Sequence, residues 1–228
     1  MPIRAVVFDV GETLVDETRV WSAWADQLGV PRLTFLAVLG GVIARGGDHR
    51  EPFGLFRPDL DFEAEARRHA ATSSPADVTR TDLYPDAEPT LAALRDAGYR
   101  LGIVGNQPAR TEALFLELDV PVDLVASSAT WGIEKPDPRF FERIAMELAL
   151  APGEIAYVGD RLDNDVAPAA RAGMLAVFVR RGPWAWIQAG RDDPPEAALT
   201  IEALSELPEA LERLAAAATT PGPAPSSG

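Results

Sequence analysis

Short apolar runs recur along the chain, and each has the length of one strand. They span Ala5–Phe8, Leu101–Val104, Leu124–Ala126, Ile155–Val158 and Ala176–Val179. Apolar runs of this kind, without polar alternation, are typical of parallel strands that are buried on both faces. The pattern therefore predicts a sheet with these five segments as buried strands.

Helical patterns separate the runs. Residues Thr90–Gly98 carry leucines three positions apart and end in glycine, a common helix stop. Residues Pro138–Leu150 place apolar side chains on one face, and a further helix is predicted over Asp165–Ala172. Strands that alternate with helices imply right-handed crossovers. We therefore predict an α/β fold with a doubly wound, mainly parallel sheet and helices on both sides.

The stretch after the first strand breaks this rhythm. Residues 17–81 hold tryptophan, phenylalanine and leucine at helical spacing and no clear strand. We expect a small helical insertion here, within a core domain formed by residues 1–16 and 82–214. Trp21 and Trp24 are expected to be core aromatics or to form the contact between the insertion and the core.

Length and composition are those of an ordinary globular protein. The 228 residues, 47% hydrophobic and 25% charged, suffice for one sizeable core and a smaller accessory domain. The chain ends in a segment rich in proline, glycine and serine, which buries too little apolar surface to offset the entropy of ordering. Residues 215–228 are therefore expected to form a disordered tail.

The net charge of −14 limits the partners. It disfavours nucleic acid and anionic membranes, whose charges would repel the protein. A small anionic substrate stays compatible, because a bound cation and a lysine can reverse the field locally. The chain has no cysteine, no basic leader followed by a long apolar stretch, and no apolar run near the roughly 20 residues of a membrane span. We expect a cytoplasmic protein, either a monomer or a homodimer.

Asp9 is the first candidate for chemistry. It ends the first apolar run, and a turn with Gly11 and Thr13 follows at once. Open α/β sheets bind ligands at this end of their strands. An ionised aspartate beside a divalent cation can attack phosphorus and form an acyl phosphate. A lone aspartate here would more often be a turn or cap residue, so the later segments decide its meaning.

Asp160 repeats this arrangement after Ile155–Val158, and Asp165 follows closely. Paired acids at the carboxyl edge of a sheet suit a hard, oxygen-liganded cation such as Mg²⁺. In the alternative interpretation, Asp160 and Asp163 only cap the helix that follows.

Lys135 and the Gly105-Asn106 turn complete the candidate site. Pro136 restricts the backbone directly after Lys135, and the lysine charge would hold together carboxylates and a phosphate that otherwise repel. Gly105 and Asn106 follow the second apolar run. Their turn either offers backbone N–H groups to an anion or is an ordinary strand-to-helix loop.

In this order, the four segments resemble the motifs of the haloacid dehalogenase superfamily, and the resemblance covers nearly the whole chain. It implies a Rossmann-like core with a small helical cap, in the phosphatase-like branch. It also implies that Asp9 is the nucleophile and that Asp9, Asp160 and the backbone carbonyl of Gly11 bind Mg²⁺. Asp165 would bind the ion through water or hold Asp160 in place.

Two positions depart from the pattern of that superfamily. Gly11 replaces the second acid of the first motif, which protonates the leaving group and activates water, and Gly105 replaces a Ser or Thr that binds the phosphoryl group. General acid–base catalysis is typically worth ~10² to 10⁴ in rate. The departures therefore predict a slow phosphatase, or one limited to activated leaving groups. Glu12 is the candidate substitute for the missing acid; otherwise it is a solvated turn residue.

Within the insertion, Arg45, His49 and Arg50 lie in a glycine-interrupted stretch. They either reach down to an anionic substrate or form a solvated loop. His69, in a charged helical segment, is expected to face solvent.

These features predict Mg²⁺-dependent hydrolysis of a small phosphate monoester, an anionic phosphorylated metabolite, through an aspartyl phosphate. A 2-haloacid dehalogenase-type hydrolase without a metal is the first alternative, because halide departure needs no proton. The retained Asp160 and Asp165 argue against it. A weakly active or non-catalytic phosphate-ligand-binding protein is the second alternative, which the glycines at positions 11 and 105 favour.

Overall fold

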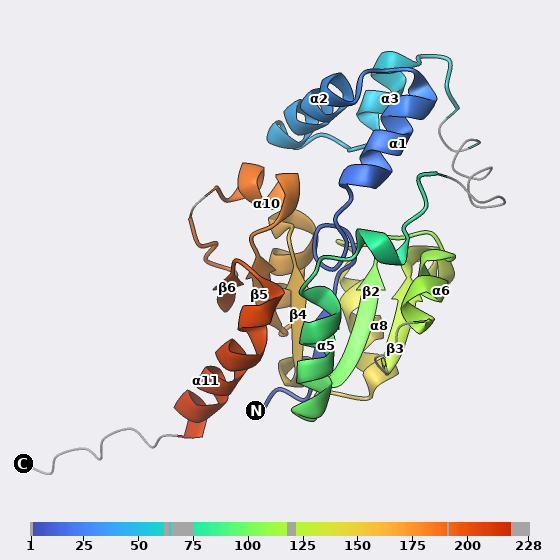
Figure 1. Cartoon of the computed structure of the whole chain (residues 1–228). Coiled ribbons are helices and arrows are strands. Elements are labelled where there is room, and N and C mark those ends of the chain that lie inside the picture. The colour runs from blue at the N-terminus through green and yellow to red at the C-terminus, as the bar shows by residue number, and fades with distance from the viewer. Residues whose placement is uncertain (1, 62–63, 65–74, 118–121, 191, 220–228) are drawn as a thin grey trace, which may run out of the picture.

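The computed structural model describes residues 2–61, 64, 75–117, 122–190 and 192–219. At its centre lies a six-stranded sheet in the order β3-β2-β1-β4-β5-β6, and every pair of neighbours is parallel. Helices cover both faces of this sheet (Figure 1). The predicted doubly wound α/β fold is confirmed.

All five predicted apolar runs are strands, and their ends differ from the prediction by at most one residue. They are β1 (Ala5–Phe8), β2 (Arg100–Gly105), β3 (Leu124–Ser127), β4 (Ile155–Gly159) and β5 (Leu175–Val179). The sixth strand, β6 (Leu199–Ile201), pairs with β5 at the edge of the sheet and was not predicted. It has three residues, of which only Ile201 is buried, so it shows no apolar run.

The helices divide between the two faces of the sheet. One face carries α5 (Ala87–Asp96), α6 (Thr111–Leu116) and α11 (Leu207–Thr219), and the other carries α8 (Pro138–Leu148), α9 (Ala167–Arg171) and α10 (Gly182–Gln188). Along β1, Val6 and Phe8 belong to the first apolar cluster, whereas Ala5 and Val7 belong to the second. This alternation follows from the two-residue period of a strand. Because both faces of β1 are buried, every residue of the strand is apolar.

Short helical turns connect these elements. They are η1 (Arg80–Asp82), α7 (Ser128–Trp131), η2 (Pro152–Glu154), η3 (Leu162–Val166) and η4 (Leu204–Glu206). The helix predicted over Asp165–Ala172 is therefore divided between the π-helical turn η3 and α9.

The helical insertion follows β1, as predicted. Its described helices are α1 (Thr18–Leu28), α2 (Arg32–Ala44) and α3 (Glu51–Phe56), and they lie above the carboxyl edge of the sheet (Figure 1). Phe35 and Phe53 form its interior with ring centroids 5.7 Å apart, and Trp24 packs edge-on against Phe53 at 5.0 Å. The insertion thus has a small aromatic core of its own.

Trp21 connects the insertion to the core. Its ring centroid lies 6.3 Å from that of Trp184 on α10, and Leu39 and Ile43 of α2 belong to the same apolar cluster. The two positions predicted for the tryptophans are therefore both occupied, because Trp24 lies inside the insertion and Trp21 lies at its contact with the core.

Arg19 ties the outgoing and returning connections of the insertion together. From the first turn of α1, its Nε and Nη2 atoms donate to the two carboxylate oxygens of Asp82, each at 2.6 Å. It also donates to the backbone carbonyls of Asp77, at 2.5 Å, and Pro75. The two chain crossings between core and insertion are thus joined at one side chain.

The chain end differs in part from the expectation. Helix α11 continues to Thr219, so residues 215–219 of the expected tail are helical. Residues 220–228 and His69 lie outside the described residues. In the part of the chain that the structure describes, no single helix is long and apolar enough to cross a membrane. Helices α1 and α2 taken together have the length and composition of a membrane span, but the pair is bent by 113°.

The apolar face of α8 generates a stability prediction. Phe141 is fully buried, and its ring centroid lies 5.2 Å from that of Tyr157 on β4. Phe141→Ala should lower the free energy of unfolding by about 3–5 kcal/mol, because it removes buried contacts and leaves a cavity. Urea denaturation measures this change. Met146→Ala on the same helix, 72% exposed, is the matched control and should stay within about 0.5 kcal/mol of the wild type; equal losses in both variants would contradict the packing of α8.

Candidate active site

Three aspartates meet at the carboxyl edge of the sheet. Because β1 and β4 are neighbours with Phe8 opposite Val158, Asp9 lies level with Gly159, and Asp160 follows one position further along the same edge. Asp165 joins them from η3, and one carboxylate oxygen from each residue lies within 4.8 Å of the others. All three residues are buried, with 7%, 1% and 0% exposure in chain order. The structure thus brings the predicted acids together.

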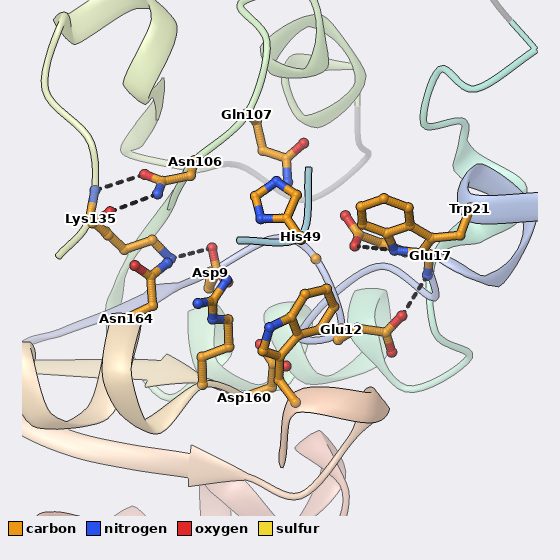
Figure 2. A pocket seen from close by; sticks show the side chains of 13 residues that line it. Asp9, Glu12, Glu17, Trp21, His49, Asn106, Gln107, Lys135, Asp160 and Asn164 are labelled. Atoms are coloured by element: carbon orange, nitrogen blue, oxygen red, sulfur yellow. Dashed lines mark hydrogen bonds and ion pairs between the residues drawn. The ribbon is translucent and has the colours of Figure 1, made fainter. Parts of the chain in front are cut away.

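Lys135 contacts two of these acids, and Figure 2 shows its contact with Asp9. Its Nζ atom is 2.6 Å from Oδ1 of Asp9 and 2.5 Å from Oδ1 of Asp165. Burial by itself would lower the pKa of Lys135, but the charges of Asp165 and Asp9 outweigh it and hold that pKa well above its usual value. Lys135 is therefore a fixed positive charge inside the acidic cluster.

Asn106 holds the backbone of Lys135 in place. The Lys135 N–H donates to Oδ1 of Asn106 at 2.8 Å, and Nδ2 of Asn106 donates to the Lys135 carbonyl at 3.0 Å. The Asn106 side chain is thus engaged with Lys135. A phosphate-binding role for the turn would fall to its backbone, and that role stays a prediction.

The cluster has the chemistry of a cation site. Oδ2 of Asp160 is buried and has no hydrogen-bond partner among the described residues. Burial, followed by the charges of Asp165 and Asp9, raises the pKa of Asp160 well above its usual range. An oxygen-liganded divalent cation would satisfy both the orphaned oxygen and the excess negative charge. The residues present therefore fit a metal ion.

The capping alternative for the acids is wrong. Within the described residues, η3 has no side-chain cap at its start. Asp163 instead accepts hydrogen bonds from the side chains of Arg161 and Gln188.

Gly105 has a steric role that the sequence did not reveal. A Cβ atom at this position would lie 2.6 Å from Oδ1 of Asp9. A serine or threonine here would therefore displace the Asp9 carboxylate from its place beside Lys135. The absence of a side chain at Gly105 thus leaves room for the Asp9 carboxylate beside Lys135.

Glu12 is buried but turned away from Asp9 (Figure 2). Its Oε2 atom accepts a hydrogen bond from the Tyr84 hydroxyl at 2.7 Å, and its Oε1 atom accepts one from the backbone N–H of Glu17 at 3.0 Å. The residue adopts a left-handed backbone with φ of 52°. Glu12 is thus neither the solvated turn residue of the alternative nor placed beside Asp9, as a substitute acid would have to be.

Glu17 is a pocket residue that sequence reasoning missed. It directly precedes α1, and its Oε2 atom accepts a hydrogen bond from Trp21 Nε1 at 3.1 Å. The Gln107 side chain lines the same pocket. Burial of the carboxyl group and, after it, the charge of Glu12 raise the pKa of Glu17 to about 8. Nothing in the spacing of the motifs marks this residue.

Of the three insertion residues proposed to reach a substrate, His49 lines the pocket. Its ring lies 6.0 Å from that of Trp21 and 6.4 Å from that of Trp184. Arg45 instead pairs with Glu51 at the surface, and Arg50 lies 3.8 Å from Asp48.

Arg161 also lines the pocket and was not singled out from the sequence. Its guanidinium lies 5.2 Å from the centre of the Trp184 ring and pairs with Asp163 at 2.8 Å. Its position directly after Asp160 was the available signal.

Comparison with known proteins places the chain in a family. Residues 3–173 match the model of the haloacid dehalogenase-like hydrolases. The chain belongs to the haloacid dehalogenase-like hydrolase family. This result confirms the predicted resemblance and the prediction of a hydrolase.

Individual relatives support this family assignment. The chain is 42% identical to a glyceraldehyde 3-phosphate phosphatase of Methanopyrus kandleri, over 84% of this chain and 90% of that protein. It is 34% identical to a phosphoserine phosphatase of Thermus thermophilus, over 70% of this chain and 68% of that protein. Among solved structures, a phosphatase of the same family from Thermococcus onnurineus aligns with a TM-score of 0.59 and 30% identity, covering 92% of this chain and 98% of that one.

The charge balance of the hydrolase site generates a second prediction. Lys135→Met leaves the buried carboxylates of Asp9 and Asp165 without their shared counter-charge. The free energy of unfolding, measured by urea denaturation at pH 7 with chelator, should fall by about 3–5 kcal/mol. Adding Asp165→Asn to this variant should recover part of the loss, because one buried charge is removed. If Lys135→Met were as stable as the wild type, the neutralising role of Lys135 would be refuted.

Proposed function

We propose that this hydrolase cleaves small phosphate monoesters, with Mg²⁺ as its cofactor and a phosphorylated Asp9 as its intermediate. The observation that carries the proposal is the buried cluster of Asp9, Asp160 and Asp165 with Lys135 inside it. Such a cluster concentrates negative charge at the sheet edge and calls for a cation. The phosphatase relatives support the same reaction class.

In the proposed reaction, a carboxylate oxygen of Asp9 attacks phosphorus as the bond between phosphorus and the alcohol oxygen breaks. Water then attacks the phosphorus, and departure of inorganic phosphate restores the Asp9 carboxylate. Lys135 orients Oδ1 of Asp9 and reduces its repulsion from the phosphate. Backbone N–H groups of the Gly105-Asn106 turn bind phosphoryl oxygens.

Asp9, Asp160 and the backbone carbonyl of Gly11 would hold the Mg²⁺, with Asp165 behind Asp160. When bound, the ion supplies positive charge beside the nucleophile and the phosphoryl oxygens. The unpartnered Oδ2 atom of Asp160 supports this assignment within the described residues.

We assign residues 17–81 the role of a cap that excludes water and selects the substrate. His49 and Trp21 line the pocket from this side, so they are the cap residues proposed to face the substrate. The surface pairing of Arg45 and Arg50 with neighbouring acids gives these two residues no part in the proposal. Glyceraldehyde 3-phosphate and phosphoserine, the substrates named for the relatives, are small phosphorylated metabolites and define the class to test first.

Phosphate release tests the function. The wild type should hydrolyse p-nitrophenyl phosphate, glyceraldehyde 3-phosphate or phosphoserine in Mg²⁺ and lose this activity in chelator. Asp9→Asn should lower the turnover number by at least about 10³-fold, because it removes the nucleophile. Phosphate is measured colorimetrically at saturating substrate.

Two other results would redirect the assignment. Release of halide from 2-chloropropionate in chelator, without phosphate release, would support the dehalogenase alternative. Tight binding of inorganic phosphate without turnover of any ester would support the phosphate-ligand-binding alternative.

Metal binding has a readout that does not depend on activity. Mg²⁺ at 100 times its dissociation constant should stabilise the wild type by about 2.7 kcal/mol, provided that it binds only the folded state. Asp160→Asn should reduce this gain in a denaturation experiment because it removes a proposed ligand. Asp163→Asn is the matched control on the same turn and should retain the gain. An equal Mg²⁺ effect in wild type and Asp160→Asn would contradict the proposed ligand set.

A further inference from the structure

We propose that Glu17 is the acid–base residue of this site. The inference rests on the proposed phosphatase function and adds the group that moves the proton. The Glu17 carboxyl group donates its proton to the alcohol oxygen as that oxygen leaves phosphorus. The resulting carboxylate then takes a proton from the water that attacks the phosphorylated Asp9, so both residues return to their starting states.

The first support is the position of the Glu17 carboxyl group. An ideal Cβ atom built on Gly11 would lie 2.6 Å from Oε1 of Glu17 and 2.8 Å from its Cδ. The carboxyl group therefore fills the space that a side chain two residues after Asp9 would occupy. The backbone at Gly11 is not left-handed, so the obstacle to a side chain there is the Glu17 carboxyl group, which would have to move.

The second support is the set of groups that hold Glu17. Trp21 donates to Oε2 from α1. Gln107, in the loop after β2, lines the same pocket as Trp21 and Asp9 (Figure 2). The carboxyl group is thus held by a hydrogen bond from the insertion, in a pocket that loops of the core also line.

The third support comes from the other carboxyl groups. Among the described residues that line the pocket, the acids are Asp9, Glu12, Glu17 and Asp160. Asp9 is the proposed nucleophile and Asp160 belongs to the proposed cation site. Glu12 is turned away from Asp9, and both of its carboxylate oxygens accept hydrogen bonds, from Tyr84 and from the backbone of Glu17 (Figure 2). Glu17 is the carboxyl group of this set that is left to transfer a proton. His49 is the other titratable group on the cap side and is the rival to exclude.

The test is the dependence of rate on the leaving group, since a proton donor matters most for a basic alcohol. Glu17→Ala should lower the turnover number by about 10²–10⁴-fold on glyceraldehyde 3-phosphate or phosphoserine and by less than about tenfold on p-nitrophenyl phosphate. Glu17→Gln, which keeps the shape and an acceptor for Trp21, should show the same selectivity. A merely structural residue would lower both rates equally.

Relocation of the carboxyl group provides the matched rescue. Gly11→Asp with Glu17→Ala should recover activity on the alkyl phosphates relative to Glu17→Ala, because the new side chain enters the vacated space. Gly11→Asp alone should be impaired, because its Cβ atom would overlap Glu17.

Several outcomes would overturn the proposal. Equal losses on alkyl and aryl phosphates, or no loss on either, would remove Glu17 from proton transfer. Appearance of the leaving-group selectivity in His49→Asn but not in Glu17→Ala would assign the proton to His49. These results leave the phosphatase function intact. Absence of phosphate release by the wild type would instead refute the proposed function, and the role of Glu17 with it.

Discussion

The buried ammonium of Lys135 is the charge on which the carboxyl edge of the sheet depends. Adjacent parallel strands necessarily bring Asp9 and Asp160 together, and η3 adds Asp165, so carboxylates accumulate where water is largely excluded. Repulsion at this spacing, in a medium of low dielectric constant, is large compared with the net stability of a folded domain. Lys135 offsets it through contacts of 2.6 and 2.5 Å, and the Asn106 side chain holds its backbone in position. The loops after β1, β2 and β4 are thereby bound into one unit.

The two glycines that depart from the family pattern share one physical explanation. Each occupies a position where an added Cβ atom would lie 2.6 Å from a carboxylate oxygen, which belongs to Asp9 for Gly105 and to Glu17 for Gly11. In both cases the position has no side chain, and the carboxyl group of another residue approaches it closely. The absence of a side chain at each glycine thus coincides with the close approach of a carboxylate group.

The sequence predicted those features that depend on local periodicity or on strand ends. The buried strands were evident as apolar runs, and Asp9 and Asp160 were found because they closely follow such runs. Lys135 was found from the proline-rich segment in which it lies. Glu17 was not found, because its approach to Gly11 depends on a turn in which Glu12 takes a left-handed backbone, and no periodic pattern encodes that turn. For the arginines of the insertion the sequence left two interpretations open. Charge alone does not distinguish an arginine that meets a substrate from one that pairs with a neighbouring acid, as Arg45 does with Glu51.

The hydrogen bonds of Arg19 have a mechanical consequence. An inserted domain is attached to its host by two separate chain crossings, and two independent attachments would permit it to shear, with one crossing sliding past the other. Here Arg19 on the outgoing segment donates hydrogen bonds to the Asp82 carboxylate and to the Asp77 carbonyl on the returning segment. The two crossings are therefore joined through one side chain. The packing of Trp21 and α2 against Trp184 is a second attachment away from the crossings, so the insertion is held to the core at two separate places.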